Sequence, residues 1–124
     1  MNTALTILFS VIFSLLLVHE MDAVRNREWK MFIVLKDMQD KTAYRIFTAL
    51  HIPLYGLIVG LLLFAETRPL AFYVLDTFLI IHALLHWFFE RHPYNTLKSA
   101  FSRFLIYTMG VLATVHIILL STLG

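Results

Sequence analysis

The first 29 residues decide the fold: the apolar run ALTILFSVIFSLLLV (residues 4–18) is followed directly by HEMDAVRNREW (residues 19–29). The apolar run predicts a membrane-spanning helix, because a helix of about 20 apolar residues crosses the hydrocarbon core of a bilayer. A membrane span whose end had no role beyond terminating the helix at the membrane surface would be followed directly by lysine or arginine. Here His19, Glu20 and Asp22 precede Arg25. Side chains that bind metals therefore lie where the chain leaves the apolar layer.

The whole chain has the composition of a membrane protein. Its 124 residues are 60% hydrophobic and 15% charged, with a mean hydropathy of +0.79, whereas soluble domains are about 45–50% apolar and about 25% charged. The absence of cysteine excludes disulfides, thiolate metal sites and iron–sulfur clusters. The net charge of +2 comes from basic residues spread along the segments that flank the apolar runs, so we do not expect nucleic-acid binding.

Four apolar segments are long enough to span the membrane, and they predict an all-α, integral membrane, up-down four-helix bundle. The segments are residues 3–18 (extending to about residue 21), 43–65, 70–89 and 100–123 of a single domain, residues 1–124. The first segment lacks the basic start and the cleavage site of a signal peptide, so we expect an uncleaved helix. The amphipathic stretch EWKMFIVLKDM (residues 28–38) predicts a short interfacial helix between the first two spans, or a cytoplasmic continuation of the first span.

The basic residues predict the orientation. One side of the predicted bundle has a single basic residue, Arg68, together with both termini. The other side carries nine: Arg25, Arg27, Lys30, Lys36, Lys41, Arg45, Arg91, Lys98 and Arg103. Because cytoplasmic loops are enriched in lysine and arginine, we expect both termini to lie outside the cytoplasm.

Histidines from three predicted helices reach one layer of the membrane. We take the first arginine beyond each helix as the membrane boundary and a rise of about 1.5 Å per residue. His19 then lies about 9 Å inside Arg25, and His51 lies about 9 Å inside Arg45. His86 and His82 lie about 7 and 13 Å inside Arg91. The spacing of Asp22 from His19, and of His86 from His82, places each pair on one helix face. Ionisable residues at such depth normally face the bundle interior and indicate a functional site.

We therefore expect a metal site between the helices, formed by imidazole and carboxylate groups at helical spacing. The predicted ligands are His19, Asp22, His51, His82 and His86. Without thiolate, such a set suits zinc, with iron as the alternative. Glu20 and Glu90 are the candidate catalytic residues, as acceptors of a proton from metal-bound water.

Other polar residues have structural interpretations. For Glu28 we favour a salt bridge with Arg25 or Arg91 over a role in closing the metal site, and for Trp29 an anchor at the membrane surface. Asp76 and His116 lie in the outer halves of antiparallel helices, where they could meet as a buried pair that holds the helices together. His92, directly before Pro93, is expected to be a loop residue.

The stretches HEMDAVRNREW (residues 19–29), HIPLY (residues 51–55) and HALLHWFFERHP (residues 82–93) resemble an uncharacterised group of small bacterial four-helix membrane proteins with an H-E-x-D-A…E-W signature. The resemblance implies a location in the bacterial inner membrane and no particular activity. HALLH is also distantly similar to the histidine boxes of the fatty-acid hydroxylases and desaturases. A second distant similarity is to the alkaline-ceramidase-like zinc hydrolases, which use three histidines and an aspartate.

These patterns favour a membrane-embedded zinc-dependent hydrolase acting on a lipid or another membrane-resident substrate. The alternatives are a di-iron oxidase or hydroxylase, a non-catalytic accessory subunit, and a b-type haem protein in which His51 pairs with His82 or His86. Membrane lipids are the expected partners. The sequence leaves open whether the chain forms a homo-oligomer or binds a partner membrane subunit.

Overall fold

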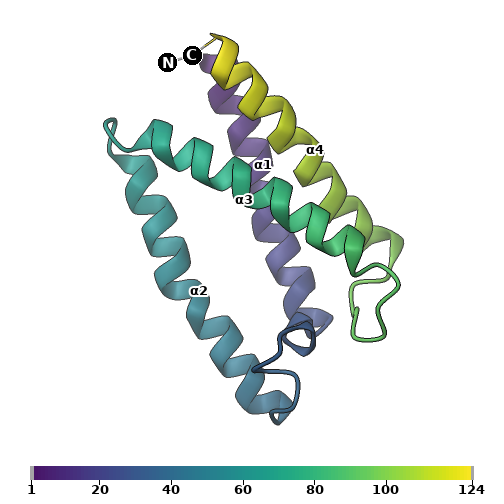
Figure 1. The fold of residues 1–124 in the computed structure, drawn as a ribbon. Helices are drawn as coiled ribbons and strands as arrows, with labels where there is room; N and C mark the ends of the chain where they lie inside the picture. The colour runs from purple at the N-terminus through teal and green to yellow at the C-terminus, as the bar shows by residue number, and fades with distance from the viewer. Residues whose placement is uncertain (1, 124) are drawn as a thin grey trace.

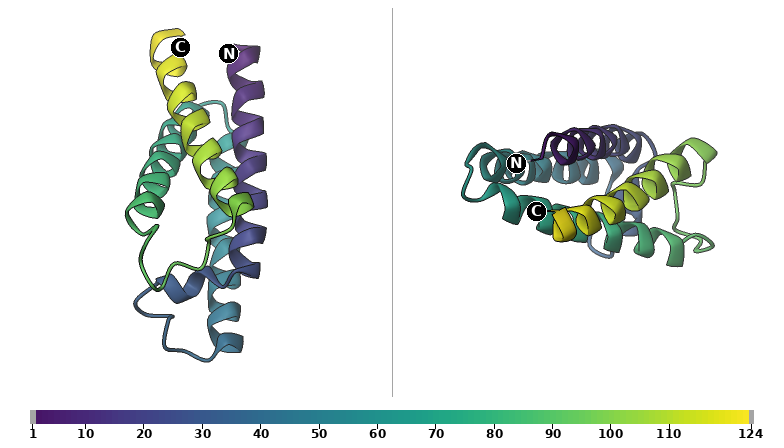
Figure 2. Two further views of the ribbon diagram at one scale, coloured as in Figure 1. Left: turned by 90° about the vertical axis from the view of Figure 1, so that its right-hand side faces the viewer. Right: turned by 90° about the horizontal axis from the view of Figure 1, so that it is seen from above.

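The computed structural model describes residues 2–123, which form four long helices and no strand. The helices are α1 (Thr3–Arg25), α2 (Asp40–Leu63), α3 (Arg68–Phe88) and α4 (Ala100–Leu123), and a 3₁₀ turn, η1 (Glu28–Met31), follows α1. All four helices are long and apolar enough to cross a membrane, which indicates a multi-pass membrane protein. The start of α1 and the end of α4 lie at the same end of the molecule (Figures 1 and 2).

The ends of the helices follow from local chemistry. The side chain of Asn2 accepts a hydrogen bond from the backbone N–H of Ala4 and so caps α1. Pro69 lies in the first turn of α3, where the missing N–H of proline costs no helical hydrogen bond. Arg27, after the end of α1, has the left-handed backbone conformation (φ 55°). The chain reverses there, and η1 begins at the next residue.

Helices α1, α3 and α4 form the packed part of the molecule. Helix α4 packs along both α3 and α1, and their apolar side chains form one core. That core consists of Leu5, Phe9, Ile12, Leu16, Phe72, Leu75, Leu79, Met109, Ala113 and Leu120. Gly110 allows the close approach of α4 to α3, because a Cβ atom there would lie 2.6 Å from the Cβ of Ala83.

Helix α2 stands apart from this packed part. It leaves the other three helices at an angle (Figure 1) and packs mainly on α3 and η1. Near its start, Ala43 and Phe47 join Trp29 and Leu35 in a second, smaller core. The predicted interfacial helix over residues 28–38 is much shorter in the structure, where only Glu28–Met31 is helical and turns follow.

Polar contacts also join the helices. His116 on α4 hydrogen-bonds to Asp76 on α3 through Nδ1 at 2.5 Å, and its Nε2 donates to the carbonyl oxygen of Leu5 on α1 at 3.1 Å. Both side chains are fully buried. The expected pairing of Asp76 with His116 is thus present, and it holds three helices together at one level.

The contact at Gly110 gives a stability prediction. We expect Gly110→Ala to lower the free energy of unfolding by about 1–3 kcal/mol, because the new methyl group overlaps Ala83. Adding Ala83→Gly should restore most of the loss by removing the opposing methyl group. Denaturant titration of the protein in detergent micelles measures both effects.

Gly60→Ala is the matched control, because a Cβ atom there would have no neighbour within 4 Å and alanine favours the helix. Equal destabilisation by the two glycine substitutions would contradict the close α3–α4 packing.

Candidate metal centre

Three histidines and one glutamate converge between α1, α3 and η1. His19 comes from the last two turns of α1, His82 and His86 lie one turn apart on α3, and Glu28 opens η1. One ligand atom from each of the four lies within 4.8 Å of the others. These four residues, called the metal centre below, could hold one metal ion.

The distances within the metal centre resemble those between the ligands of one ion. The Nε2 atoms of His82 and His86 are 3.2 Å apart, and ligand atoms about 2.0–2.1 Å from a tetrahedral zinc are about 3.3 Å apart. The Nε2 of His19 lies 3.7 Å from Oε2 of Glu28, and the Nε2 of His86 lies 3.8 Å from Oε1. A small contraction around an ion would bring all four ligand atoms into coordination.

Burial separates this group from an ordinary polar contact. His19 is fully buried, and neither of its ring nitrogens has a hydrogen-bond partner among residues 2–123. The same holds for Nδ1 of His82 and Oε2 of Glu28. A buried polar atom without a partner costs about 1–3 kcal/mol. Coordination of an ion by one nitrogen of each ring and by Glu28 would compensate much of that cost.

The chain around Glu28 explains how it reaches the histidines. The left-handed Arg27 turns the chain back after α1, and Trp29 is buried against Phe47 and Tyr44 of α2. Trp29 is therefore a packing residue in this structure, unlike the surface anchor expected from sequence. Its burial holds η1 beneath α1 and α3, so that Glu28 points into the centre.

The electrostatic surroundings keep Glu28 ionised. Burial raises the pKa of this carboxyl, but the neighbouring His82, His86 and His19 lower it more strongly, and the net effect holds its pKa below the usual range. Glu28 is therefore a carboxylate at neutral pH, the form that binds metal ions. The salt bridge with Arg25 or Arg91 expected from sequence is not formed; its carboxylate faces the three histidines instead.

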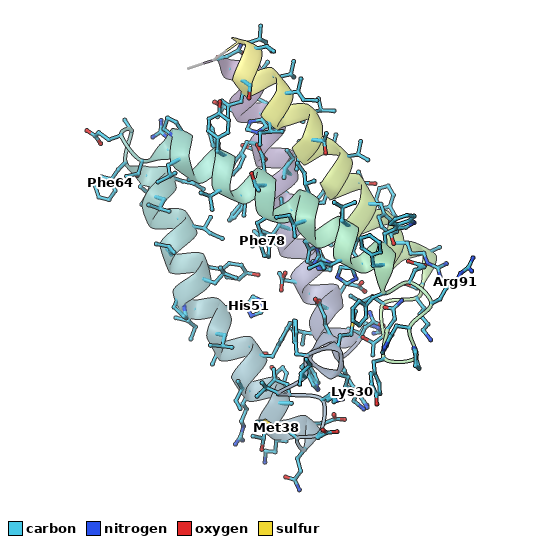
Figure 3. The ribbon with its side chains drawn as sticks, viewed as in Figure 1. Lys30, Met38, His51, Phe64, Phe78 and Arg91 are labelled. Carbon is cyan, nitrogen blue, oxygen red and sulfur yellow. The ribbon has the colours of Figure 1, made fainter. Side chains whose placement is uncertain are left out.

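Glu20 and His51 form a pair beside the metal centre. Oε2 of Glu20 lies 2.6 Å from Nε2 of His51, and Oε1 of Glu20 lies 4.0 Å from Nε2 of His19. His51 points from α2 toward α1 (Figure 3), and its Nδ1 bonds to the carbonyl oxygen of Phe47 at 2.7 Å. Of the sequence-predicted ligands, His51 thus lies next to the group of four without belonging to it.

Asp22 lies outside the metal centre. Its Oδ2 accepts a hydrogen bond from the buried hydroxyl of Ser102 on α4 at 2.5 Å, and its Oδ1 accepts one from Asn26 at 2.9 Å. Although Asp22 shares a helix face with His19, it is one turn nearer the helix end, where α4 rather than α3 is the neighbour. Its contacts tie α1 to α4.

Glu90 also has other partners. It forms an ion pair with Arg103, and its Oε2 accepts a hydrogen bond from Tyr107 at 2.6 Å. It is not one of the four converging residues. His92 is an exposed loop residue whose Nδ1 accepts a hydrogen bond from the backbone of Tyr94.

Three of the four converging residues, His19, His82 and His86, are among the ligands predicted from the sequence. The fourth, Glu28, was predicted to form a salt bridge instead. The one sequence feature that bears on Glu28 is its place directly before Trp29, in a short loop that follows the helix of His19. A buried tryptophan in such a loop fixes the position of its neighbour. The apolar pattern alone did not distinguish a buried tryptophan from one at the membrane surface.

The sequence model of a protein family of unknown function (DUF6713) matches residues 5–123 of the chain. The chain belongs to this family. The match includes α2, α3, α4, α1 from residue 5 onward, and every residue of the metal centre, so the centre lies within the family domain. No curated protein and no solved structure matches the chain.

The contacts of Asp22 lead to a prediction that separates a packing residue from a ligand. We expect Asp22→Ala to lower the free energy of unfolding by about 1–3 kcal/mol, because the buried hydroxyl of Ser102 loses its acceptor. The variant should bind as much zinc as the wild type. Unfolding curves and zinc content of the purified protein measure the two effects.

Asp37→Ala, at an exposed loop position, should change neither quantity. Loss of zinc from Asp22→Ala at unchanged stability would show instead that this aspartate is a ligand.

Proposed function

We propose that this membrane protein binds zinc in the metal centre and uses it to hydrolyse a membrane-resident substrate. The observation that carries the proposal is the convergence of His19, His82, His86 and Glu28, whose ligand atoms lie within 4.8 Å of one another in a buried site. Three imidazoles and one carboxylate, without thiolate, form a set that zinc binds readily. Iron(II) is the alternative metal for the same donors.

The geometry disfavours the haem alternative. Two axial imidazoles must lie on opposite faces of a porphyrin, with their nitrogens about 4 Å apart across the iron. The expected axial pair is His51 with His82 or His86. Nε2 of His51 lies 2.6 Å from Oε2 of Glu20, and the Nε2 atoms of His82 and His86 lie 3.2 Å from each other, so each of these nitrogens already faces another polar group instead of a porphyrin.

Hydrolysis is supported by the groups beside the centre. A zinc ion lowers the pKa of a bound water to about 7 and polarises a carbonyl or phosphoryl oxygen. Glu20, whose Oε1 lies 4.0 Å from Nε2 of His19, is the carboxylate that we assign to assist this water. The water oxygen would add to the electrophilic atom of an ester or amide, and its proton would pass to the leaving group.

The position of the centre supports a substrate that resides in the membrane. His19 lies about 9 Å from the end of α1, at a rise of about 1.5 Å per residue. The side chains that lie between the metal centre and α2 are partly exposed. The exposed fraction is 17% for the side chains of Glu20 and His51 and 14% for that of His82. A lipid whose ester or amide group lies near the bilayer surface would approach from this side.

A structural metal site is the second candidate function. It is favoured by the presence of four protein ligands, because structural zinc sites are closed by four residues whereas catalytic sites keep one position open. In that case zinc would hold η1 against α1 and α3, and removing it would cause loss of stability without loss of any reaction.

Zinc content tests the proposal. Wild-type protein purified in detergent and dialysed against buffered zinc should retain at least one equivalent. We expect His82→Ala and Glu28→Gln to lower the zinc content of the metal centre to roughly a tenth of the wild-type value, because each substitution removes a ligand. Elemental analysis measures the content, with the exposed-loop variant His92→Ala as a control that should match the wild type.

The same preparations distinguish the two candidates when they are placed in vesicles of bacterial lipid extract. Release of hydrolysis products by zinc-loaded wild type, abolished by chelation and in His82→Ala, supports the hydrolase. Zinc-dependent stability without any product supports the structural site. Less than half an equivalent of any transition metal in the wild type would overturn the metal centre itself.

A further inference from the structure

The segment between η1 and α2 carries apolar side chains that are open to the surroundings of the protein. Ile33 is 84% exposed, Val34 74% and Phe32 44%. Most other exposed large hydrophobic side chains lie on the four long helices, where a membrane would cover them. Residues 32–38, by contrast, form turns and a bend outside those helices. Exposed apolar residues that are contiguous in this way mark a surface that contacts a partner or a membrane.

Local hydrogen bonds fix which of these side chains point outward. The backbone N–H groups of Leu35 and Lys36 both donate to the carbonyl oxygen of Phe32, at 3.2 and 2.9 Å, and they close a tight turn. Leu35 is buried in the second core, so one side of the turn is anchored to the protein. Ile33 and Val34, called the apolar corner below, form the exposed side.

The turn lies at the depth where α2 enters the membrane. The ring of Phe32 stacks on that of Phe47 in α2, with the ring centroids 6.0 Å apart. Phe47 lies two residues inside Arg45, which is about 3 Å at the rise of a helix. Lys30 and Met38, on either side of the turn, lie beside the start of α2 (Figure 3). The apolar corner is thus at the level of the lipid headgroups.

The charges around the turn favour anionic lipid as its partner. Residues 25–45 include six basic and three acidic side chains. Asp40 already pairs with Arg27 and Lys30, and Glu28 faces the histidines of the metal centre. The remaining excess of positive charge attracts anionic headgroups. A second copy of the chain would bring the same positive charge and would be repelled.

The turn shares a core with the residue next to Glu28. Leu35 packs with Trp29 and Phe47 in the second core, and Trp29 directly follows Glu28 in the chain. If the turn left the membrane surface, the packing of Leu35 and then of Trp29 would loosen. Glu28 would in that case no longer be held in the metal centre.

We propose that the apolar corner inserts among anionic lipid headgroups and that this contact holds Glu28 in the metal centre, so that lipid binding strengthens zinc binding. The effect on zinc rests on the proposed metal centre, whereas the insertion does not depend on it. An apolar turn with basic neighbours binds a membrane surface through both its buried apolar area and its attraction to anionic lipid.

Fluorescence of the full-length protein in lipid nanodiscs, with one chain per disc, tests the insertion. The chain has no cysteine, so Ile33→Cys provides a single site for the environment-sensitive fluorophore nitrobenzoxadiazole. We expect blue-shifted emission that nitroxide-labelled lipid quenches in discs containing phosphatidylglycerol. Glu66→Cys, exposed in the hairpin between α2 and α3, is the matched control, and its emission should not depend on lipid charge.

Two results would overturn the proposed lipid surface. One is emission from labelled Ile33→Cys in anionic discs that resembles emission in water. The other is a blue shift that appears only in discs holding two chains, because a second copy would then cover the apolar corner.

Zinc titration in the same anionic discs tests the link to the metal centre. We expect the double variant Ile33→Ser/Val34→Ser to bind zinc about tenfold more weakly than the wild type, as it would if Glu28 were in place about a tenth of the time. Ile33→Leu/Val34→Leu keeps the apolar corner and should bind zinc as the wild type does. Zinc accumulates equally at the anionic surface around all three proteins, so their comparison isolates the turn.

Size-exclusion chromatography and circular dichroism check that each variant is folded. Equal zinc affinity of the wild type and the serine variant in anionic discs would overturn the link between the turn and Glu28. Absence of zinc binding by the wild type would overturn the metal centre, and with it the effect on zinc. The fluorescence of labelled Ile33→Cys would still decide the insertion.

Discussion

The structure depends on the cost of placing polar groups inside a membrane. An imidazole or carboxylate in the hydrocarbon region loses its hydration, and it is stable there only when another group of the protein, or a bound ion, replaces the lost water. His19 is fully buried with both ring nitrogens lacking a protein partner among the described residues. The three groups that approach it are Glu28, His82 and His86. A cation at their common point accounts for all four side chains together.

The remaining polar contacts fix the helices around this point. Asp76 and His116 join α3 to α4 and, through Leu5, to α1 in the outer part of the core. Asp22 and Ser102 join α1 to α4 nearer the metal centre. Because each contact has only one favourable register, the two together fix the level of α1 relative to its neighbours. His19 is thereby brought to the level of the two histidines of α3.

The sequence was sufficient to predict the helices and the layer of the histidines. The apolar runs are long, and a membrane leaves the backbone few other conformations, so four helices followed from composition alone. The level of each histidine followed from the constant rise of a helix. The depth of a residue in the membrane, however, does not determine which helix packs beside it. Asp22 was predicted as a ligand because it shares a face with His19, yet α4 lies beside that turn, and its serine takes the carboxylate.

Two other features depend on tertiary packing that no periodicity encodes. Glu28 reaches the metal centre because Arg27 reverses the chain and Trp29 is buried against α2, a loop conformation that the local sequence does not specify. Helix α2 packs mainly on α3 and η1, an arrangement that the expectation of an up-down four-helix bundle does not specify. Glu20 and His51 join α1 to α2, which explains why His51 lies beside the metal centre instead of within it.

The measurement that tests the central claim most directly is X-ray absorption spectroscopy at the zinc edge of the zinc-loaded protein, prepared with one equivalent of metal. We predict scattering from about three imidazole rings and one carboxylate, with zinc–ligand distances of about 2.0–2.2 Å. The imidazole contribution should fall by about one third in His86→Ala. A zinc ion surrounded mainly by water oxygens, or a spectrum that His86→Ala leaves unchanged, would contradict the metal centre.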